Sequence, residues 1–180
     1  LRELQQDLPI EIITHPRNQG KGQAIRSGLQ RCRGDFVIIQ AADLEYDPAY
    51  YPQLLAPIVT GQADVVYGTR FSRTQDHPLR FFLWGNKLLT KLTNVCAGLR
   101  LTDMETGHKV FTRQAANSIQ LKENRFGLEP ELTVKLAKQG WRFREIPVSY
   151  AGRGRAEGKK IKWKDGLRAV WVILRESLLG

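Results

Sequence analysis

The most suggestive segment of the sequence is a group of carboxylates that directly follows a continuous apolar run. The run at residues 35–40 is typical of a strand buried on both faces of a parallel sheet. In an extended stretch after it, Asp43 and Glu45 would lie on the same side of the chain. Two oxygen donors on one side suit Mg²⁺ or Mn²⁺, which takes one or two protein carboxylates and completes its shell with phosphate and water. We therefore expect a divalent metal ion at Asp43, together with Glu45.

Helix capping is the alternative role for these acids. Asp commonly caps a helix that begins just after it, and both Asp43 and Asp47 precede a helical pattern that starts near Pro48. We assign the cap to Asp47, which leaves Asp43 for the metal.

The basic residues point to an anionic partner. Lys and Arg number 28 against 18 Asp and Glu, so the net charge is 28 − 18 = +10. Such an excess suits a phosphorylated small molecule, a nucleic acid or an acidic membrane surface. Lys21, between Gly20 and Gly22, can approach a phosphate, although a glycine-rich turn before a helix is also an ordinary connector. Arg70, after a predicted strand, is either a substrate clamp or a surface residue.

Strands and helices alternate along the chain, which predicts an α/β sheet with ligands at the carboxyl ends of its strands. Apolar runs predict the strands, and helical periodicity, proline and glycine mark the helices. The predicted strands are residues 10–14, 35–40, 63–68, 109–112 and 141–150, and the predicted helices are residues 23–31, 49–60, 78–97, 113–120, 130–139 and 165–179.

Length and composition exclude several classes of protein. A chain of 180 residues with 42% apolar residues fits one packed domain and is too apolar for a disordered chain. The longest apolar run, residues 169–174, is far shorter than the roughly 20 residues of a membrane-spanning helix.

The cysteines and histidines do not form a zinc pattern. Cys32 and Cys96 are far apart, and the histidines are scattered at positions 15, 77 and 108. Without a recognisable signal peptide, we expect a reducing cytosolic setting in which both thiols stay free.

Four blocks of the sequence belong together: residues 37–48, 63–71, 101–111 and 123–131. In this order they resemble family 2 glycosyltransferases, most closely the branch with dolichyl-phosphate mannosyltransferase and bacterial polyprenyl-phosphate glucosyltransferases. The resemblance extends over nearly the whole chain and implies a GT-A-type, Rossmann-like, mostly parallel sheet flanked by helices. It divides the chain into a partial GT-A domain at residues 1–158 and a basic amphipathic segment at residues 159–180.

The sequence departs from this family in two places. Family members carry an aspartate-any-aspartate motif, and this chain has Ala41 where the first aspartate belongs, keeping only Asp43. The resemblance also implies two earlier strands, which hold the nucleotide base and ribose, before Leu1.

The reaction implied by the resemblance is inverting transfer of a hexose from a nucleotide diphosphate sugar to a polyprenyl phosphate, dolichyl or undecaprenyl. A phosphate with a second pKa near 6 is largely ionised at neutral pH, so the acceptor needs positioning more than deprotonation. Mg²⁺ or Mn²⁺ at Asp43 and Glu45 would neutralise charge on the departing diphosphate.

The resemblance also assigns roles to individual residues. Asp43, Arg70 and Asp103 are the expected catalytic residues; Arg70 would clamp the lipid phosphate or the donor. Asp103 would orient the acceptor or act as a base, and a structural hydrogen bond in its loop is an equal alternative. Glu131 is equally explained as an acid in a helix's first turn. The expected substrate-binding positions are Lys21, Ala41, Glu105, Arg125, Glu129, Arg153, Lys159 and Lys160.

A lipid substrate requires access to a membrane surface. The lysines and tryptophan of residues 159–164 precede a predicted helix with an apolar stripe, which suits a helix lying in the membrane interface. Packing of the same stripe on the sheet is the alternative. We expect peripheral attachment at the cytoplasmic face of a membrane. The stripe consists of Leu167, Val170, Trp171, Leu174 and Leu178.

Three other functions compete with this one. A transferase acting on a saccharide hydroxyl would use the same donor but require a true general base. A homologue degenerate at Ala41 would bind the donor without turnover. A basic nucleic-acid-binding module is the non-enzymatic alternative, but no pattern of such a module is present, and we expect no nucleic-acid partner.

Overall fold

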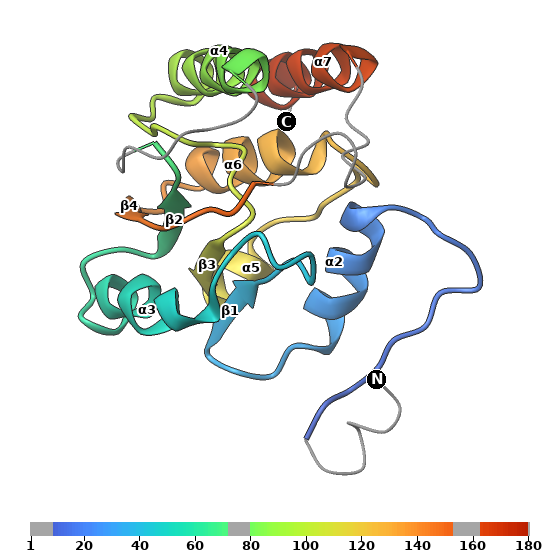
Figure 1. The fold of residues 1–180 in the computed structure, drawn as a ribbon, viewed down its shortest axis with the longest axis vertical. Coiled ribbons are helices and arrows are strands. Elements are labelled where there is room, and N and C mark those ends of the chain that lie inside the picture. Colours follow the sequence, from blue (N-terminus) through green and yellow to red (C-terminus); the bar gives the residue numbers. More distant parts are fainter. Residues whose placement is uncertain (1–8, 72–79, 153–162, 180) are drawn as a thin grey trace.

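The structure, a computed structural model, describes residues 9–71, 80–152 and 163–179, and consists of a mixed sheet with helices on both faces (Figure 1). The strands are β1 (Phe36–Ile39), β2 (Val65–Thr69), β3 (Lys109–Thr112) and β4 (Phe143–Pro147). The helices are α2 (Lys21–Arg31), the 3₁₀ turn η1 (Pro48–Tyr50), α3 (Tyr51–Val59), α4 (Arg80–Ala97), α5 (Arg113–Asn117), α6 (Leu128–Lys138) and α7 (Trp163–Leu179).

The strands lie in the order β1-β3-β2-β4. β3 is antiparallel to both β1 and β2, whereas β2 and β4 are parallel, so three of the four strands run in one direction. The carboxyl ends of β1, β2 and β4 therefore meet at one edge of the sheet, where an α/β sheet holds its ligands.

Alternate residues of the strands form two separate cores, as the pleat of a sheet requires. Val65, Tyr67 and Phe111 face the cluster that contains leucines of α6. Val66 and Val110 face the opposite cluster, to which α3 contributes Leu54 and Ile58. The central strand β2 is thus buried on both faces, which explains its apolar composition. The edge strand β1, predicted to be buried on both faces, is only partly buried, and its Phe36 is 42% exposed.

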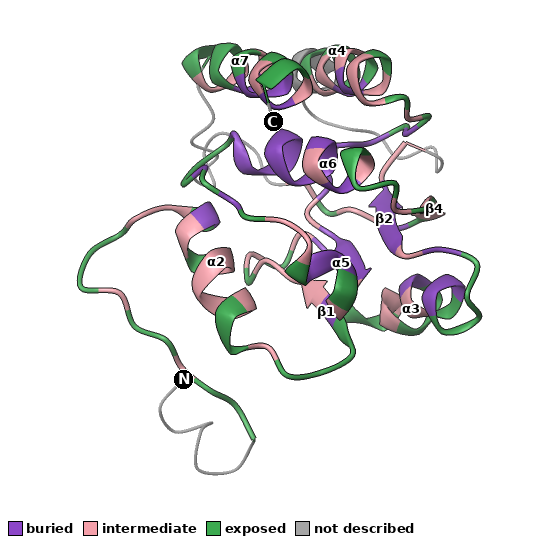
Figure 2. Ribbon diagram, turned by 180° about the vertical axis from the view of Figure 1, so that it is seen from behind, coloured by how far each residue is buried: buried purple, intermediate pink, exposed green. Residues whose placement is uncertain are grey.

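Helices α4 and α7 lie side by side over α6 and form the outer layer of the molecule (Figures 1 and 2). α7 packs inward through residues such as Val172 and Ile173, which are fully buried. The predicted apolar stripe faces outward instead: Leu167 is 60% and Leu178 is 78% exposed. Packing of this stripe on the sheet, the alternative prediction, is therefore wrong.

The predicted strand at residues 10–14 does not form. Residues 9–14 have no regular secondary structure, and Ile10 and Ile13 are exposed. A run of β-branched residues becomes a strand only when a neighbouring strand completes its hydrogen bonds, and none of the described strands pairs with this segment.

Two other elements form as predicted, but their observed ends differ from the predicted ends by a few residues. The strand predicted at residues 141–150 is confined to Phe143–Pro147, and the helix predicted from residue 130 begins at Leu128. Within the described ranges, no helix has both the length and the apolar character that crossing a bilayer requires.

Candidate active site

The loop after β1 folds into a turn and is not extended. Leu44 has a φ of 60°, in the left-handed region, and its side chain is 90% exposed. The Asp43 carboxylate accepts a hydrogen bond from the Glu45 amide over 3.3 Å, as aspartate does in a local turn. The prediction that strand alternation places Asp43 and Glu45 on the same side is therefore wrong. Ala41 lies at the start of the same loop.

This loop is attached to the segment that follows β4. The Tyr150 hydroxyl donates to Glu45 Oε2 over 3.0 Å, and the Ala151 amide donates to the Glu45 carbonyl over 3.0 Å. Burial raises the pKa of Tyr150, and the neighbouring Glu45 carboxylate raises it further. Asp47 accepts from the Ala49 amide over 2.9 Å at the start of η1, so its predicted capping role is confirmed.

Tyr46 fills the space beneath the loop. Its buried hydroxyl accepts a hydrogen bond from the Gly107 amide over 2.8 Å, and a Cβ at Gly107 would lie 2.7 Å from the tyrosine ring. The ring also stacks at 4.5 Å from His108, whose Nε2 lies 2.5 Å from Gln40 Oε1. Burial lowers the pKa of His108, despite the opposing effect of Asp47. The loop and the 106–108 segment therefore form one packed unit.

Arg70 and Asp103 form a buried bidentate ion pair at the carboxyl end of β2. Arg70 Nε lies 2.6 Å from Asp103 Oδ2, and Nη2 lies 2.7 Å from Oδ1. The Asp103 side chain is fully buried and that of Arg70 is 10% exposed. Burial alone would lower the pKa of Arg70, but Tyr46 and the Asp103 carboxylate outweigh burial and raise it. Asp103 thus orients Arg70, and both stay candidate catalytic residues.

Lys21 and Glu129 form a second ion pair, with Nζ and Oε1 2.6 Å apart. The lysine side chain is 42% exposed and the glutamate only 9%. Burial alone would lower the pKa of Lys21, but Glu129 outweighs it and the pKa is raised. The flanking glycines have a structural reason: a Cβ at Gly20 or Gly22 would overlap carbonyl oxygens of residues 123 and 124.

Glu105 and Lys109 complete a network of charges below these pairs. Lys109 Nζ donates to the Met104 and Thr106 carbonyls over 2.8 and 2.6 Å. Glu105 Oε1 is buried without a hydrogen-bond partner among the described residues. Burial and the nearby Glu129 carboxylate raise the pKa of Glu105 to about 8. Burial lowers the pKa of Lys109 to about 8, although Glu129 opposes the change.

The structure brings five of the predicted site residues together: Lys21, Arg70, Asp103, Glu105 and Glu129. Glu105 interacts electrostatically with Arg70, Asp103 and Glu129, so both ion pairs belong to one charged region at the strand ends. Arg125 is separate and lines a cavity at the surface. Predicted residues Arg153, Lys159 and Lys160 lie outside the described residues.

Sequence reasoning missed Lys109, Tyr46, Glu145 and Tyr150. Glu145 accepts hydrogen bonds from the Thr102 and Asp103 amides over 2.7 and 2.9 Å, and so fixes the loop that carries Asp103. A lysine next to an apolar strand was the one visible signal for Lys109. The contacts of Tyr46, Glu145 and Tyr150 join residues more than 40 positions apart, and no local pattern reveals such pairs.

The acids at the site are suited to a hard divalent cation. Across the described ranges, no cluster of three or more His, Cys, Asp or Glu side chains forms a metal cage. Asp43 and Glu45 nevertheless lie in one turn, in which Asp43 Oδ1 accepts from the Glu45 amide and Glu45 Oε2 accepts from Tyr150. Mg²⁺ commonly binds through one or two carboxylates when substrate phosphates supply other ligands, so this donor set fits an ion shared with a diphosphate.

Residues 1–120 match the family model described as "Glycosyl transferase family 2". Among curated proteins, the chain is 29% identical over 167 residues to a low-salt glycan biosynthesis hexosyltransferase of Haloferax volcanii, covering 91% of this chain and 40% of that protein. It is 29% identical to a dolichyl-phosphate beta-glucosyltransferase of Trichomonas vaginalis, covering 94% and 53%. An undecaprenyl-phosphate 4-deoxy-4-formamido-L-arabinose transferase of Pseudomonas fluorescens is 30% identical, with 85% and 43% covered.

Solved structures share the fold. A glucosyl-3-phosphoglycerate synthase from Mycobacterium tuberculosis, in complex with Mn²⁺, UDP and phosphoglyceric acid, superposes with a TM-score of 0.65 at 18% identity, covering 98% of this chain and 59% of that one. The same enzyme with Mg²⁺ and UDP gives a TM-score of 0.66 at 19% identity, with 96% and 58% covered. The predicted GT-A-type fold is thereby confirmed, and the chain spans about half the length of the curated relatives it matches.

Proposed function

Since the chain belongs to glycosyl transferase family 2, we propose that the protein is an inverting hexosyltransferase that moves a sugar from a nucleotide diphosphate to a polyprenyl phosphate. The observation that carries this proposal is the similarity along most of the chain to transferases named for dolichyl phosphate and undecaprenyl phosphate. The charged region at the strand ends supports it, because both substrates of such a reaction are anionic phosphates.

The reaction exchanges one phosphate for another at the anomeric carbon. An oxygen of the lipid phosphate forms the new bond to this carbon as its bond to the diphosphate oxygen breaks, and the nucleoside diphosphate leaves with the electron pair. A lipid phosphate is already ionised at neutral pH, so no proton must be removed. The protein's task is to hold cations where the two anions meet.

Arg70 is preorganised for this task. Asp103 occupies Nε and Nη2 of the guanidinium, which fixes its plane and leaves Nη1 for a substrate oxygen. A donor fixed before the reaction needs no reorganisation as charge develops, which is the main source of electrostatic catalysis. Asp103 in this role is a positioning residue.

Lys21 supplies a second, more accessible cation. Glu129 fixes its ammonium from the buried side, while the exposed part of the lysine remains open to a phosphate. Asp43, with Glu45, would hold Mg²⁺ or Mn²⁺, and the ion would offset charge on the diphosphate. Each of these cations would offset part of the charge that the two phosphate-bearing substrates bring.

The outer layer of α4 and α7 is the proposed contact with the membrane surface that holds the lipid. Trp163 is 73% exposed and Trp171 49% on α7, and Trp84 is 75% exposed on α4. The two helices lie side by side. Helices that lie in a membrane interface typically combine tryptophans and leucines on one face with lysines and arginines on the other.

Product analysis tests the proposed reaction. The full-length protein is incubated with UDP- or GDP-hexoses, Mg²⁺ and farnesyl phosphate, and the lipid fraction is examined for a new sugar phosphodiester. We expect a lipid-linked sugar whose formation requires the phosphate group of the acceptor. Absence of a sugar phosphodiester from the lipid fraction would overturn the proposal.

Vesicle sedimentation tests the membrane contact separately. Replacement of two outward-facing α7 residues, Leu167→Gln with Leu178→Gln, removes exposed apolar surface and should weaken binding to anionic vesicles. Val59→Gln is the matched control, because Val59 is 66% exposed on α3, on another part of the molecule. Equal binding by the α7 variant and the control would contradict this contact.

A further inference from the structure

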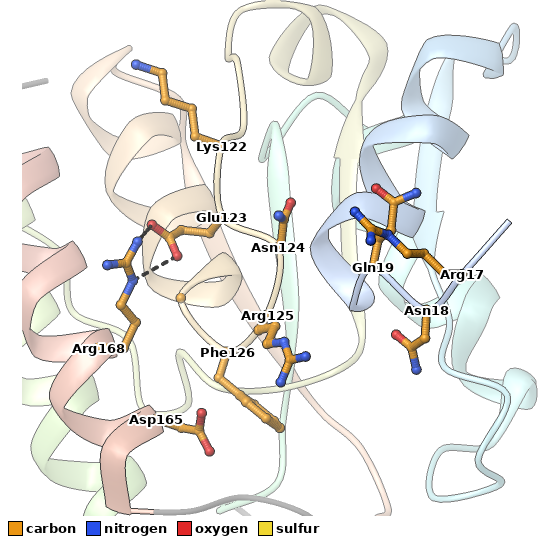
Figure 3. A pocket seen from close by; sticks show the side chains of 11 residues that line it. Arg17, Asn18, Gln19, Lys122, Glu123, Asn124, Arg125, Phe126, Asp165 and Arg168 are labelled. Carbon is orange, nitrogen blue, oxygen red and sulfur yellow. Dashed lines mark hydrogen bonds and ion pairs between the residues drawn. The ribbon is translucent and has the colours of Figure 1, made fainter. Parts of the chain in front are cut away.

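A cavity of about 600 Å³ opens beside the candidate active site, between three segments that are distant in sequence. Residues 17–19 before α2 form one wall, the loop at residues 122–127 forms the second, and the first turns of α7 form the third (Figure 3). Gly20 lies between the cavity and the candidate active site. On one side it packs so close to Arg125 that an added Cβ would lie 3.0 Å from Arg125 Cγ, and on the other side it is followed in the chain by Lys21. The cavity therefore adjoins the Lys21 turn.

The side chains that line the cavity leave an excess of positive charge. Its basic residues are Arg17, Lys122, Arg125 and Arg168, and its acids are Glu123 and Asp165. The Glu123 carboxylate is already paired with arginines of α7. Arg168 donates to its two oxygens over 2.8 and 3.1 Å, and Arg175 donates to one of them over 3.0 Å. By contrast, the side chains of Arg17, Lys122 and Arg125 form no ion pair with any part of the chain that the structure describes.

The wall that carries Lys122 and Arg125 is held rigidly. The buried Glu131 carboxylate accepts from the Lys122 and Glu123 amides over 2.7 to 3.0 Å. On the other side, Gly22 donates its amide to the Asn124 carbonyl over 2.9 Å. A loop whose backbone is fixed from both sides loses little backbone freedom on binding, which favours affinity.

The chemistry of the lining suits a phosphate group. Arginine binds phosphate through paired hydrogen bonds, and several cations around one cavity stabilise a multiply charged oxyanion. Phe126, 37% exposed, adds an apolar surface beside Arg125 on which a nucleobase or an isoprenoid chain can pack.

We propose that this cavity is a phosphate-binding site in which Arg17 and Arg125 hold the anion. The identity of the molecule rests on the proposed function, which offers two carriers of the same group: the lipid phosphate and the nucleotide diphosphate. The site extends the charged region around Lys21 to residues that the reaction described above does not use.

Direct binding measurements test this site. Arg17→Gln and Arg125→Gln in the full-length protein are titrated with farnesyl phosphate, UDP and GDP, and compared with Arg33→Gln. Arg33 is an exposed residue beyond the other end of α2 and loses the same charge. Because a hydrogen bond to a charged group contributes strongly to binding, we expect each cavity variant to bind at least one probe about tenfold more weakly than the control does.

The probes separate the two carriers. Weaker binding of farnesyl phosphate alone identifies the lipid headgroup, and weaker binding of UDP or GDP alone identifies the donor diphosphate. Binding of all three probes at the level of Arg33→Gln would overturn the proposed site. Binding is measured without turnover, so a protein that loses phosphate binding in the cavity variants yet transfers no sugar would overturn the proposed function and leave the site intact.

Discussion

The two ends of β2 carry the same ion pair in opposite surroundings. Before the strand, Arg142 binds Asp64 through Nε at 2.8 Å, Nη2 at 2.9 Å and its amide at 3.1 Å. After the strand, Arg70 binds Asp103 through the same three groups at 2.6, 2.7 and 3.1 Å. The first arginine side chain is 57% exposed and the second only 10%.

This difference shows that location, more than geometry, decides what an ion pair does. The Arg142 side chain is largely exposed although Asp64 is only 18% exposed, so solvent screens the attraction in part and the pair contributes less. The Arg70–Asp103 pair is buried at the carboxyl end of the strand, where α/β sheets bind ligands. There each partner requires the other, and in the proposed reaction the pair would hold a cation for an anionic substrate.

The largest effect is expected from Asp103→Asn. The substitution leaves the Arg70 charge buried without its carboxylate, and such a loss costs about 3–5 kcal/mol of unfolding free energy. Urea unfolding followed by circular dichroism measures it, with Asp64→Asn as the matched control. A decrease no greater than that of the control would mean that burial does not distinguish the two pairs.

Ala41→Asp should raise the turnover, which would sharpen the contrast between the two ends of the sheet. Position 41 lies in the loop that carries Asp43, and a second carboxylate would strengthen the proposed metal site. Since removing one electrostatic group commonly lowers turnover by about 10² to 10³, we expect restoring one to raise it by at least about tenfold. Sugar transfer by the full-length protein is the measurement, and equal turnover of the two proteins would defeat the expectation.

Glu105→Gln should change how stability depends on pH. The folded-state pKa of Glu105, about 8, lies above its ordinary value of 4.5, so the folded protein binds this proton more tightly than the unfolded chain does. The contribution of the protonated Glu105 to the free energy of unfolding is therefore complete below about pH 4.5 and is lost as the pH rises toward 8.

The variant should flatten the stability profile between pH 5 and 8, measured as unfolding free energy at several pH values. Lys109, whose pKa is lowered from 10.5 to about 8, acts in the opposite direction and only above pH 8. An unchanged slope between pH 5 and 8 would show that Glu105 is ionised throughout this range.

The smallest effect is expected from Asp64→Asn. Hydrogen bonds from Arg142 hold the pKa of Asp64 below its ordinary value of 3.8. The carboxylate therefore stabilises the fold above that value, and this contribution is lost as the pH falls through the lower folded-state pKa. The variant should differ slightly from the parent at pH 7 and not at all in strong acid. Thermal unfolding at both pH values tests this, and a large decrease at pH 7 would remove the contrast between the ends of β2.

Local patterns were sufficient to predict most strands and helices of the core and to single out Arg70, but not the residue with which Arg70 pairs. The continuous apolar run before Tyr67 predicted β2, and Arg70 was identified because it follows that strand. Its partner Asp103 lies 33 positions away, and their meeting depends on the order of the strands. No local pattern specifies that order, so Asp103 was expected to meet the acceptor and its pairing with Arg70 was not predicted.

The wrong predictions share a physical cause, which is that they depend on contacts that the local sequence does not specify. The strand at residues 10–14 has suitable residues but no partner strand among the described elements. Asp43 and Glu45 do not lie on the same side of an extended chain, because Leu44 between them adopts a left-handed conformation. The loop is held in this shape by a hydrogen bond from Tyr150, which lies 105 positions from Glu45.

The most direct test of the account is sugar transfer to farnesyl phosphate by Asp103→Asn and Asp64→Asn in the full-length protein, at a temperature where both variants remain folded. We predict that Asp103→Asn loses most of the turnover, because Arg70 is no longer oriented, and that Asp64→Asn keeps it. Comparable turnover in the two variants would contradict the placement of the reaction at the carboxyl end of β2.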